Sequence, residues 1–207
     1  MKAEGLHVSW LVQILPYIEE RNAYQLFDQS AGAYAQVNRD IRSMPISVIE
    51  CPSFPGAERN DSKTAYRSTY AGCHYDQEAP IDAKNNGVLF LNSNLRYSDI
   101  LDGSSQTLLL GEFRPDFNEL GWVSGTRASL RNTGTINDLC ILRERRINKE
   151  LPPPGPLEVG GFASAHPGGI NSVFADGSVQ FISEDIDEDI LHQIGHRSDG
   201  KLLKECF

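Results

Sequence analysis

The feature that most constrains the fold is the stretch FASAHPGGINSVFADGSVQFI at 162–182. It contains two runs of strand-forming residues and two turn sequences, a His-Pro-Gly-Gly that begins at His166 and an Asp-Gly at Asp176. Asp-Gly between such runs is a strong hairpin signal, because both residues accept positive φ in tight turns. A third strand-like run, GGFASA, precedes His166. The stretch therefore predicts a three-stranded antiparallel meander, with Val173 opposite either Val179 or Gln180 depending on the turn type.

The residues after this meander predict a helix over 184–194. Ser183 is a suitable N-cap, and acidic residues fill the first turn, where the helix dipole favours them. Gly195 is a suitable C-terminal stop. Four apolar side chains recur at helical spacing and form one stripe: Ile186, Ile190, Leu191 and Ile194.

The rest of the chain predicts a mixture of short helices and strands. We expect a helix over 16–27, a helical turn at Ser98 and a buried apolar run at 88–91. Strands are expected over 46–51, 68–75 and 106–112. The span 114–158 reads as a loop-rich insertion that ends in a stiff proline-rich connector. Together these features predict one α+β domain over 1–207, with helices packed on an antiparallel sheet and closed by the C-terminal meander and a final helix.

The charge and hydropathy of the chain exclude some classes of function. The 207 residues carry a formal net charge of −9, and no basic stripe offsets it. An acidic surface repels phosphate backbones, so nucleic acid is not an expected partner. No segment of the sequence is apolar enough for a membrane-spanning helix.

The cysteines do not have the spacing of a zinc site. Cys51, Cys73, Cys140 and Cys206 are widely spread and contain no Cys-x-x-Cys. In an oxidising compartment they could form two disulfides, in any of three pairings; in the cytosol they would stay reduced as small core residues. Pairing Cys51 with Cys73 and Cys140 with Cys206 gives loops that do not overlap, which is a weak preference.

A catalytic triad of Ser164, His166 and Asp176 is the sharpest enzymatic interpretation, and the predicted meander opposes it. The two turns lie at opposite ends of one strand, roughly 20 Å apart at about 3.3 Å per residue. Hydrogen bonds require about 3 Å. We therefore expect His166, Gly168, Gly169, Asp176 and Gly177 to be structural turn residues or weak ligands, and we expect no enzymatic activity.

Three other groups of residues have side chains suited to chemistry. Cys73 and His74 are adjacent in a predicted strand and should point to opposite faces. Glu112, with Arg114 nearby, is either a buried salt bridge or a site carboxylate. The alternating acids after Ser183 lack the glycine and glutamate that an EF-hand loop needs. No cofactor is expected, although a weak calcium site at Asp176 stays open.

Four blocks of the sequence resemble a known family: SWLVQILPYIEE at 9–20, ECPSFPG at 50–56, YSDILDGSSQTLLLGE at 97–112 and the stretch 162–182. They are similar to the family marked by a C-terminal His-x9-Asp-Gly motif, the domain of unknown function 1559. Here the motif falls on His166, Asp176 and Gly177. Members typically begin with a prepilin-type cleavage signal and a hydrophobic helix, which this sequence lacks, and are regarded as type IV pilin-like or pseudopilin-like.

The resemblance implies a fold and a setting. It implies a pilin-like globular head outside the cytoplasmic membrane, anchored to the inner membrane in the full-length parent through the missing N-terminal helix. The expected partners are other pilin-like subunits or the machinery of type II secretion or type IV pili. An oxidising location would make disulfides plausible. The function expected from this is structural or secretion-associated.

A second class of function is an extracytoplasmic binding module for a small molecule or a glycan. Its cleft would be lined by aromatic side chains, of which the sequence offers Tyr66, Tyr70, Tyr75 and Trp122. A concave pocket with convergent polar groups would favour this class. A flat surface would favour assembly.

Overall fold

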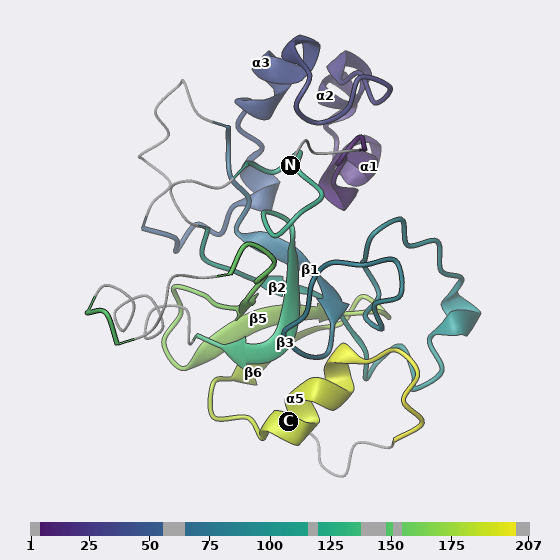
Figure 1. The fold of residues 1–207 in the computed structure, drawn as a ribbon, viewed down its shortest axis with the longest axis vertical. Helices are drawn as coiled ribbons and strands as arrows, with labels where there is room; N and C mark the ends of the chain where they lie inside the picture. The colour runs from purple at the N-terminus through teal and green to yellow at the C-terminus, as the bar shows by residue number, and fades with distance from the viewer. Residues whose placement is uncertain (1–4, 56–64, 116–119, 138–147, 151–154, 202–207) are drawn as a thin grey trace. The chain divides into compact units, whose positions relative to one another are not determined.

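The computed structural model describes residues 5–55, 65–115, 120–137, 148–150 and 155–201 (Figure 1). The chain divides into two compact units, and the single domain expected from the sequence stays a prediction. Unit 1 comprises Met1–Tyr70 and Pro115–Ser129, and unit 2 comprises Ala71–Arg114 and Leu130–Phe207. Each unit therefore contains two segments that are distant in the sequence.

Unit 1 is built from short helices. They are α1 (Trp10–Ile14), the 3-10 helix η1 (Leu15–Tyr17), α2 (Arg21–Leu26), η2 (Gln36–Asn38), α3 (Arg39–Arg42) and η3 (Ser47–Ile49). Ser9 caps α1, since its side chain accepts a hydrogen bond from the Leu11 amide. The helices enclose a core that includes Leu11, Leu15 and Trp122, each no more than 1% exposed.

Two predicted elements of unit 1 differ from the structure. The helix expected over 16–27 is interrupted, because Glu19 takes a positive φ of 66° between η1 and α2. The strand expected over 46–51 is instead η3. Ile46 and Ile49 are both buried in the core, and a 3-10 turn brings residues three apart onto one side.

The second segment of unit 1 closes the first by backbone hydrogen bonds. The Trp122 amide donates to the Tyr66 carbonyl at 2.9 Å, and the Ser9 amide donates to the Val123 carbonyl at 2.9 Å. The Tyr66 hydroxyl donates to Glu50, and burial together with this bond raises the pKa of Tyr66 to about 12. Tyr66 and Trp122 therefore belong to the core and do not line an open aromatic cleft.

Unit 2 is organised around a six-stranded mixed sheet, so the fold is α+β (Figure 1). Its strands in chain order are β1 (Tyr70–Tyr75), β2 (Leu108–Glu112), β3 (Leu130–Ile136), β4 (Gly161–Phe162), β5 (Gly169–Phe174) and β6 (Val179–Ser183). The spatial order is β4-β3-β1-β2-β5-β6. β3 runs parallel to β1 and to β4, whereas β5 is antiparallel to β2 and to β6. The expectation of an antiparallel sheet is therefore wrong for the two pairs that β3 forms.

The predicted meander is also wrong in one strand. β4 pairs with β3 at the far edge of the sheet and not with β5. After β4 the chain crosses to the end of β2, where the Ala163 amide donates to the Glu112 carbonyl at 3.0 Å, and only then turns into β5. Only β5 and β6 form the predicted hairpin, because neighbours in sequence need not be neighbours in a sheet.

The span 114–158, expected as a loop-rich insertion, supplies an interior strand of the sheet. β3 lies between β4 and β1. Its residues LRNTGTI are mostly polar, yet Asn132 and Thr133 are buried. The apolar run 88–91 was expected to be buried, but it forms a loop in which Leu91 is 42% exposed.

One face of the sheet is covered by α5 (Glu188–Gly195) (Figure 1). Leu191 and Ile194 of this helix pack with Ile170, Phe174 and Ile182 in a single apolar cluster. The helix was predicted from Ser183, but it begins after Asp187, whose carboxylate accepts hydrogen bonds from the amides of the first turn. Among the described residues no helix is long and apolar enough to span a bilayer.

Candidate functional site

The His-x9-Asp-Gly stretch forms the two ends of β5. His166 lies in the turn that precedes this strand, and Asp176 lies in the turn that follows it. The register of the β5–β6 hairpin runs without a shift from Gly169 opposite Ser183 to Val173 opposite Val179. The motif therefore brackets one strand, as the sequence predicted.

The Asp-Gly turn is a three-residue hairpin loop. The Gly177 amide donates to the Phe174 carbonyl at 2.9 Å, and the Phe174 amide donates to the Ser178 carbonyl at 2.9 Å. Gly177 has φ 86°, the left-handed conformation that follows a type I turn in such loops. This turn type explains why Val173 faces Val179 and not Gln180.

Asp176 stabilises the same turn through its carboxylate. Oδ1 accepts hydrogen bonds from the Ser178 amide at 2.8 Å and from the Ser178 hydroxyl at 2.7 Å. The bonds from the hydroxyl and the amide hold the pKa of Asp176 below its usual range. Asp176 is solvent-exposed. The calcium site considered at this residue stays a prediction.

The two glycines after His166 are required for different reasons. Gly168 has φ 81° and open space around it, so only its backbone conformation excludes larger residues. Gly169 has no room: a Cβ there would overlap the Ile182 carbonyl oxygen and lie 2.8 Å from two ring carbons of Phe181. The pair therefore lets the chain turn sharply and then enter the sheet directly beneath the Phe181 ring.

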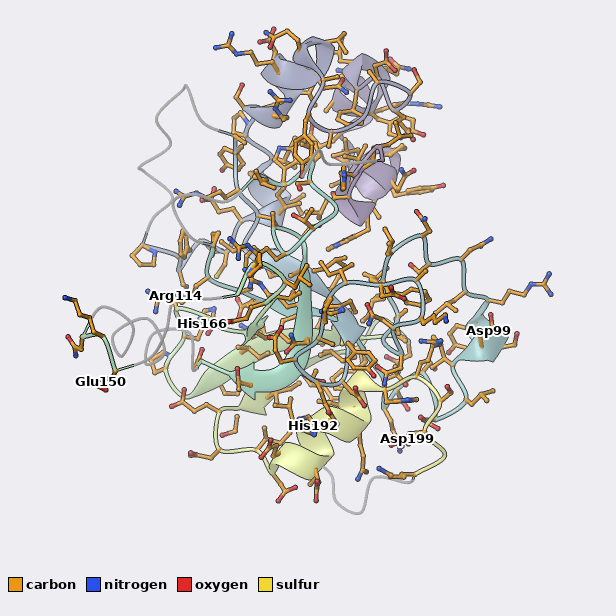
Figure 2. The ribbon with its side chains drawn as sticks, in the orientation of Figure 1. Asp99, Arg114, Glu150, His166, His192 and Asp199 are labelled. Atoms are coloured by element: carbon orange, nitrogen blue, oxygen red, sulfur yellow. The ribbon has the colours of Figure 1, made fainter. Side chains whose placement is uncertain are left out.

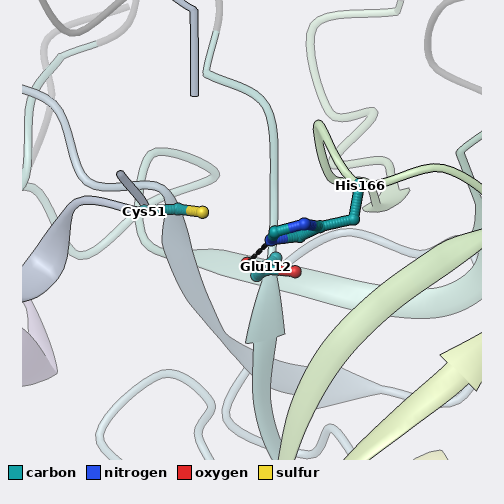
Figure 3. A group of neighbouring side chains, drawn as sticks. All are labelled: Cys51, Glu112 and His166. Carbon is teal, nitrogen blue, oxygen red and sulfur yellow. Dashed lines mark hydrogen bonds and ion pairs between the residues drawn. The ribbon is translucent and has the colours of Figure 1, made fainter. Parts of the chain in front are cut away.

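The side chain of His166 meets Glu112 from the end of β2. Its Nε2 atom lies 3.1 Å from Glu112 Oε1 (Figure 3). The His166 side chain is 28% exposed, whereas that of Glu112 is 3% exposed. With the carboxylate oxygen as acceptor, Nε2 is the donor in this pair.

Asn171 completes the environment of the buried carboxylate. Glu112 Oε2 accepts from the Asn171 amide at 2.8 Å and from its side-chain Nδ2 at 3.2 Å. Antiparallel pairing of β2 with β5 puts Gly111 opposite Ser172, which brings Glu112 and Asn171 to the same end of the two strands. The carboxylate thus has three donors, which compensates for its removal from water.

Ser164 is not arranged as a nucleophile for His166. Its hydroxyl donates to the Gly169 carbonyl at 2.6 Å and accepts from the His166 backbone amide at 2.9 Å. Asp176, the third member of the triad that we considered, is bonded to Ser178 at the other end of β5. Ser164, His166 and Asp176 therefore bond to three different partners and do not form a catalytic triad.

Cys73 and His74 do not form a nucleophile–base pair. Cys73 and His74 lie in β1, and burial raises the pKa of the Cys73 thiol. Its Sγ atom lies 3.7 Å from the carbonyl oxygens of Tyr75 and Gly195. His74 bonds through Nδ1 to Asn85 Oδ1 at 3.1 Å. Of the described cysteines, Cys51 and Cys73 are not joined by a disulfide, and Cys140 and Cys206 lie outside the described residues.

Sequence reasoning found Glu112 but not its partners. The structure shows His166 and Asn171 as partners of Glu112, and the salt bridge with Arg114 stays a prediction. Figure 2 shows His192 on α5, where it approaches Glu188 at 3.9 Å. No local pattern could have matched His166 to Glu112, because 54 positions separate them.

The fold and the site together describe an α+β protein in which a short His-x9-Asp-Gly motif builds the border hairpin of a mixed sheet. The family model for a protein of unknown function, DUF1559, matches residues 2–189. The chain therefore belongs to this family, which confirms the resemblance seen in the sequence. No curated protein and no solved structure matches the chain.

Proposed function

We propose that this chain is the head of a pilin-like or pseudopilin-like structural protein that works outside the cytoplasmic membrane and has no enzymatic activity. The observation that carries the proposal is the use of the motif. His166 and Asp176, the two groups most suited to catalysis, serve at opposite ends of β5. The glycines between and after them shape the turns.

The chemistry at His166 supports a structural role. The imidazole holds a buried carboxylate, and that carboxylate holds the backbone of β5 through Asn171. These bonds fasten the turn before β5 to the end of β2. A site of this kind determines where the β5–β6 hairpin lies and needs no substrate.

The setting of the protein follows from the family resemblance. On this proposal the parent is anchored in the inner membrane by a hydrophobic N-terminal helix, and the described units face outward. Its partners are other pilin-like subunits or the machinery of secretion. The net charge of −9 agrees with a surface that does not bind nucleic acid.

The test is the location of the full-length protein in its own cells. We expect a membrane-impermeant biotinylation reagent to label it in cells whose outer layer has been opened, and we expect it to sediment with membranes or sheared surface filaments. A cytoplasmic enzyme in the same cells serves as the control. Recovery of the protein with that enzyme, unlabelled and soluble, would contradict the proposal.

A further inference from the structure

The outer edge of β6 is the one long border of the sheet. The opposite border, β4, has two residues, whereas β6 has five. Among the residues that the structure describes, none pairs with the outer edge of β6. A strand edge with unpaired amides and carbonyls is a template for another strand.

The hydrogen-bond phase of the hairpin shows which groups face outward. The Phe174 amide bonds to the Ser178 carbonyl, and the Glu184 amide bonds to the Gly168 carbonyl, both at 2.9 Å. Bonded and non-bonded pairs alternate along an antiparallel ladder. Gln180 and Ile182 therefore direct their backbone groups toward β5, and Val179 and Phe181 direct theirs to the free edge.

The side chains at these two positions are also exposed. Val179 is 66% exposed and Phe181 is 49% exposed, although both are apolar. Natural edge strands are usually protected by a charged residue, a proline or a bulge. β6 has the sequence VQFIS, without charge or proline, and its register with β5 is regular.

The charges at the two ends of this edge select the partner. Asp176 is exposed at the start of β6, and Glu184 and Asp185 are exposed just after its end. A second copy of β6 running antiparallel would place these acids against their counterparts, which is unfavourable. A strand with basic ends would instead find a complementary charge at each end.

We infer that β6 is a docking edge for an extended segment of another protein, which adds to the sheet as a further strand. That segment carries β-branched or aromatic residues at alternate positions and Lys or Arg at both ends. Backbone hydrogen bonds to Val179 and Phe181 supply affinity, and the two exposed side chains and the flanking acids supply selectivity. This goes beyond the proposed function, since it names a contact edge and a partner chemistry that hold or fail wherever the protein is located.

The test is titration calorimetry with two synthetic peptides, KKTVTFTVKK and EETVTFTVEE. The lysine-flanked peptide is expected to bind the chain, and the glutamate-flanked peptide to bind at least roughly tenfold more weakly, about 1.4 kcal/mol. Val179→Pro removes one outward amide without touching the β5–β6 ladder and should weaken binding by a similar factor. Val179→Thr keeps the amide and should therefore lose less affinity than Val179→Pro.

Three results would overturn the inference. One is a lysine-flanked peptide that does not bind. Another is equal affinity for the two peptides, or for the wild type and Val179→Pro when both show the same circular dichroism. The third is a dimer in analytical ultracentrifugation that Val179→Pro dissociates, because the occupant of the edge would then be a second copy.

Discussion

Glu112 is the residue on which the site depends, because its buried carboxyl group takes its hydrogen bonds from the turn before β5 and from β5 itself. His166 and Asn171 provide three hydrogen bonds to a side chain that is 3% exposed. Removing the Glu112 carboxylate leaves the donors of His166 and Asn171 without their acceptor. The free energy lost in this way exceeds the net contribution of the hydrogen bonds to stability.

We predict that Glu112→Ala lowers the free energy of unfolding by about 3 kcal/mol. The matched control is Glu188→Ala, which removes an exposed histidine–glutamate contact of unit 2. Glu188 is 80% exposed and lies 3.9 Å from His192, so its loss should cost less than about 1 kcal/mol. Urea unfolding of both variants measures the difference, and equal costs would show that burial of Glu112 contributes nothing.

At the scale of elements, the start of α5 illustrates how a cap is chosen. The chain offers several capping residues in a row, and Asp187 takes the position because its carboxylate reaches the amides of Asp189 and Ile190 at 2.9 and 3.3 Å. Ser183, the cap expected from the sequence, lies instead at the end of β6 and accepts from the Asp185 amide.

Asp187→Ala is therefore expected to lower the free energy of unfolding by about 1 kcal/mol, because the first turn loses its side-chain acceptor. Ser183→Ala should change the same quantity by less than about 0.5 kcal/mol, since Ser183 is an exposed residue outside the helix. Thermal melting followed by circular dichroism at the helix band compares the two. A larger loss for Ser183→Ala would place the helix start where the sequence predicted it.

At the scale of the whole molecule, pH should act through a buried histidine of β1. His74 is 0% exposed, and burial lowers the pKa of its imidazole below the usual 6.5. Glu78 opposes this shift, and Arg131 adds to it. Below pH 6.5 the unfolded chain binds a proton at this position that the folded chain does not, so the folded state loses stability as the pH falls.

We predict that the free energy of unfolding falls between pH 7.5 and 5.5, with His74 contributing a slope of up to about 1.4 kcal/mol per pH unit below pH 6.5. His74→Gln should reduce this slope, whatever its effect on stability at pH 7.5. His192→Gln, at a partly exposed position on α5, is the comparison, and a reduction of the slope as large as that of His74→Gln would contradict a role for burial. Identical slopes for the wild type and His74→Gln would refute the prediction.

Features that depend on contacts between neighbouring residues could be predicted from the sequence, whereas features that depend on distant contacts could not. The hairpin at Asp176-Gly177 and the apolar stripe of α5 were predictable, because neighbouring residues determine a turn and a helix face. The strands at 68–75 and 106–112 were found with ends that differ by two residues. The strand predicted over 46–51 is absent, and a 3-10 helix takes its place. The spacing of apolar residues alone does not distinguish a short strand from a helical turn in a buried segment.

By itself the sequence determined the family, the α+β class and the structural use of the glycines around β5. Only the tertiary structure decided the order of the strands, and with it the inclusion of the polar β3 in the sheet and the pairing of His166 with Glu112. The physical reason is that sheet order depends on which distant segments bury their faces together. The free energy gained by this burial depends on both segments of a pair, so it cannot be read from the sequence of one segment alone.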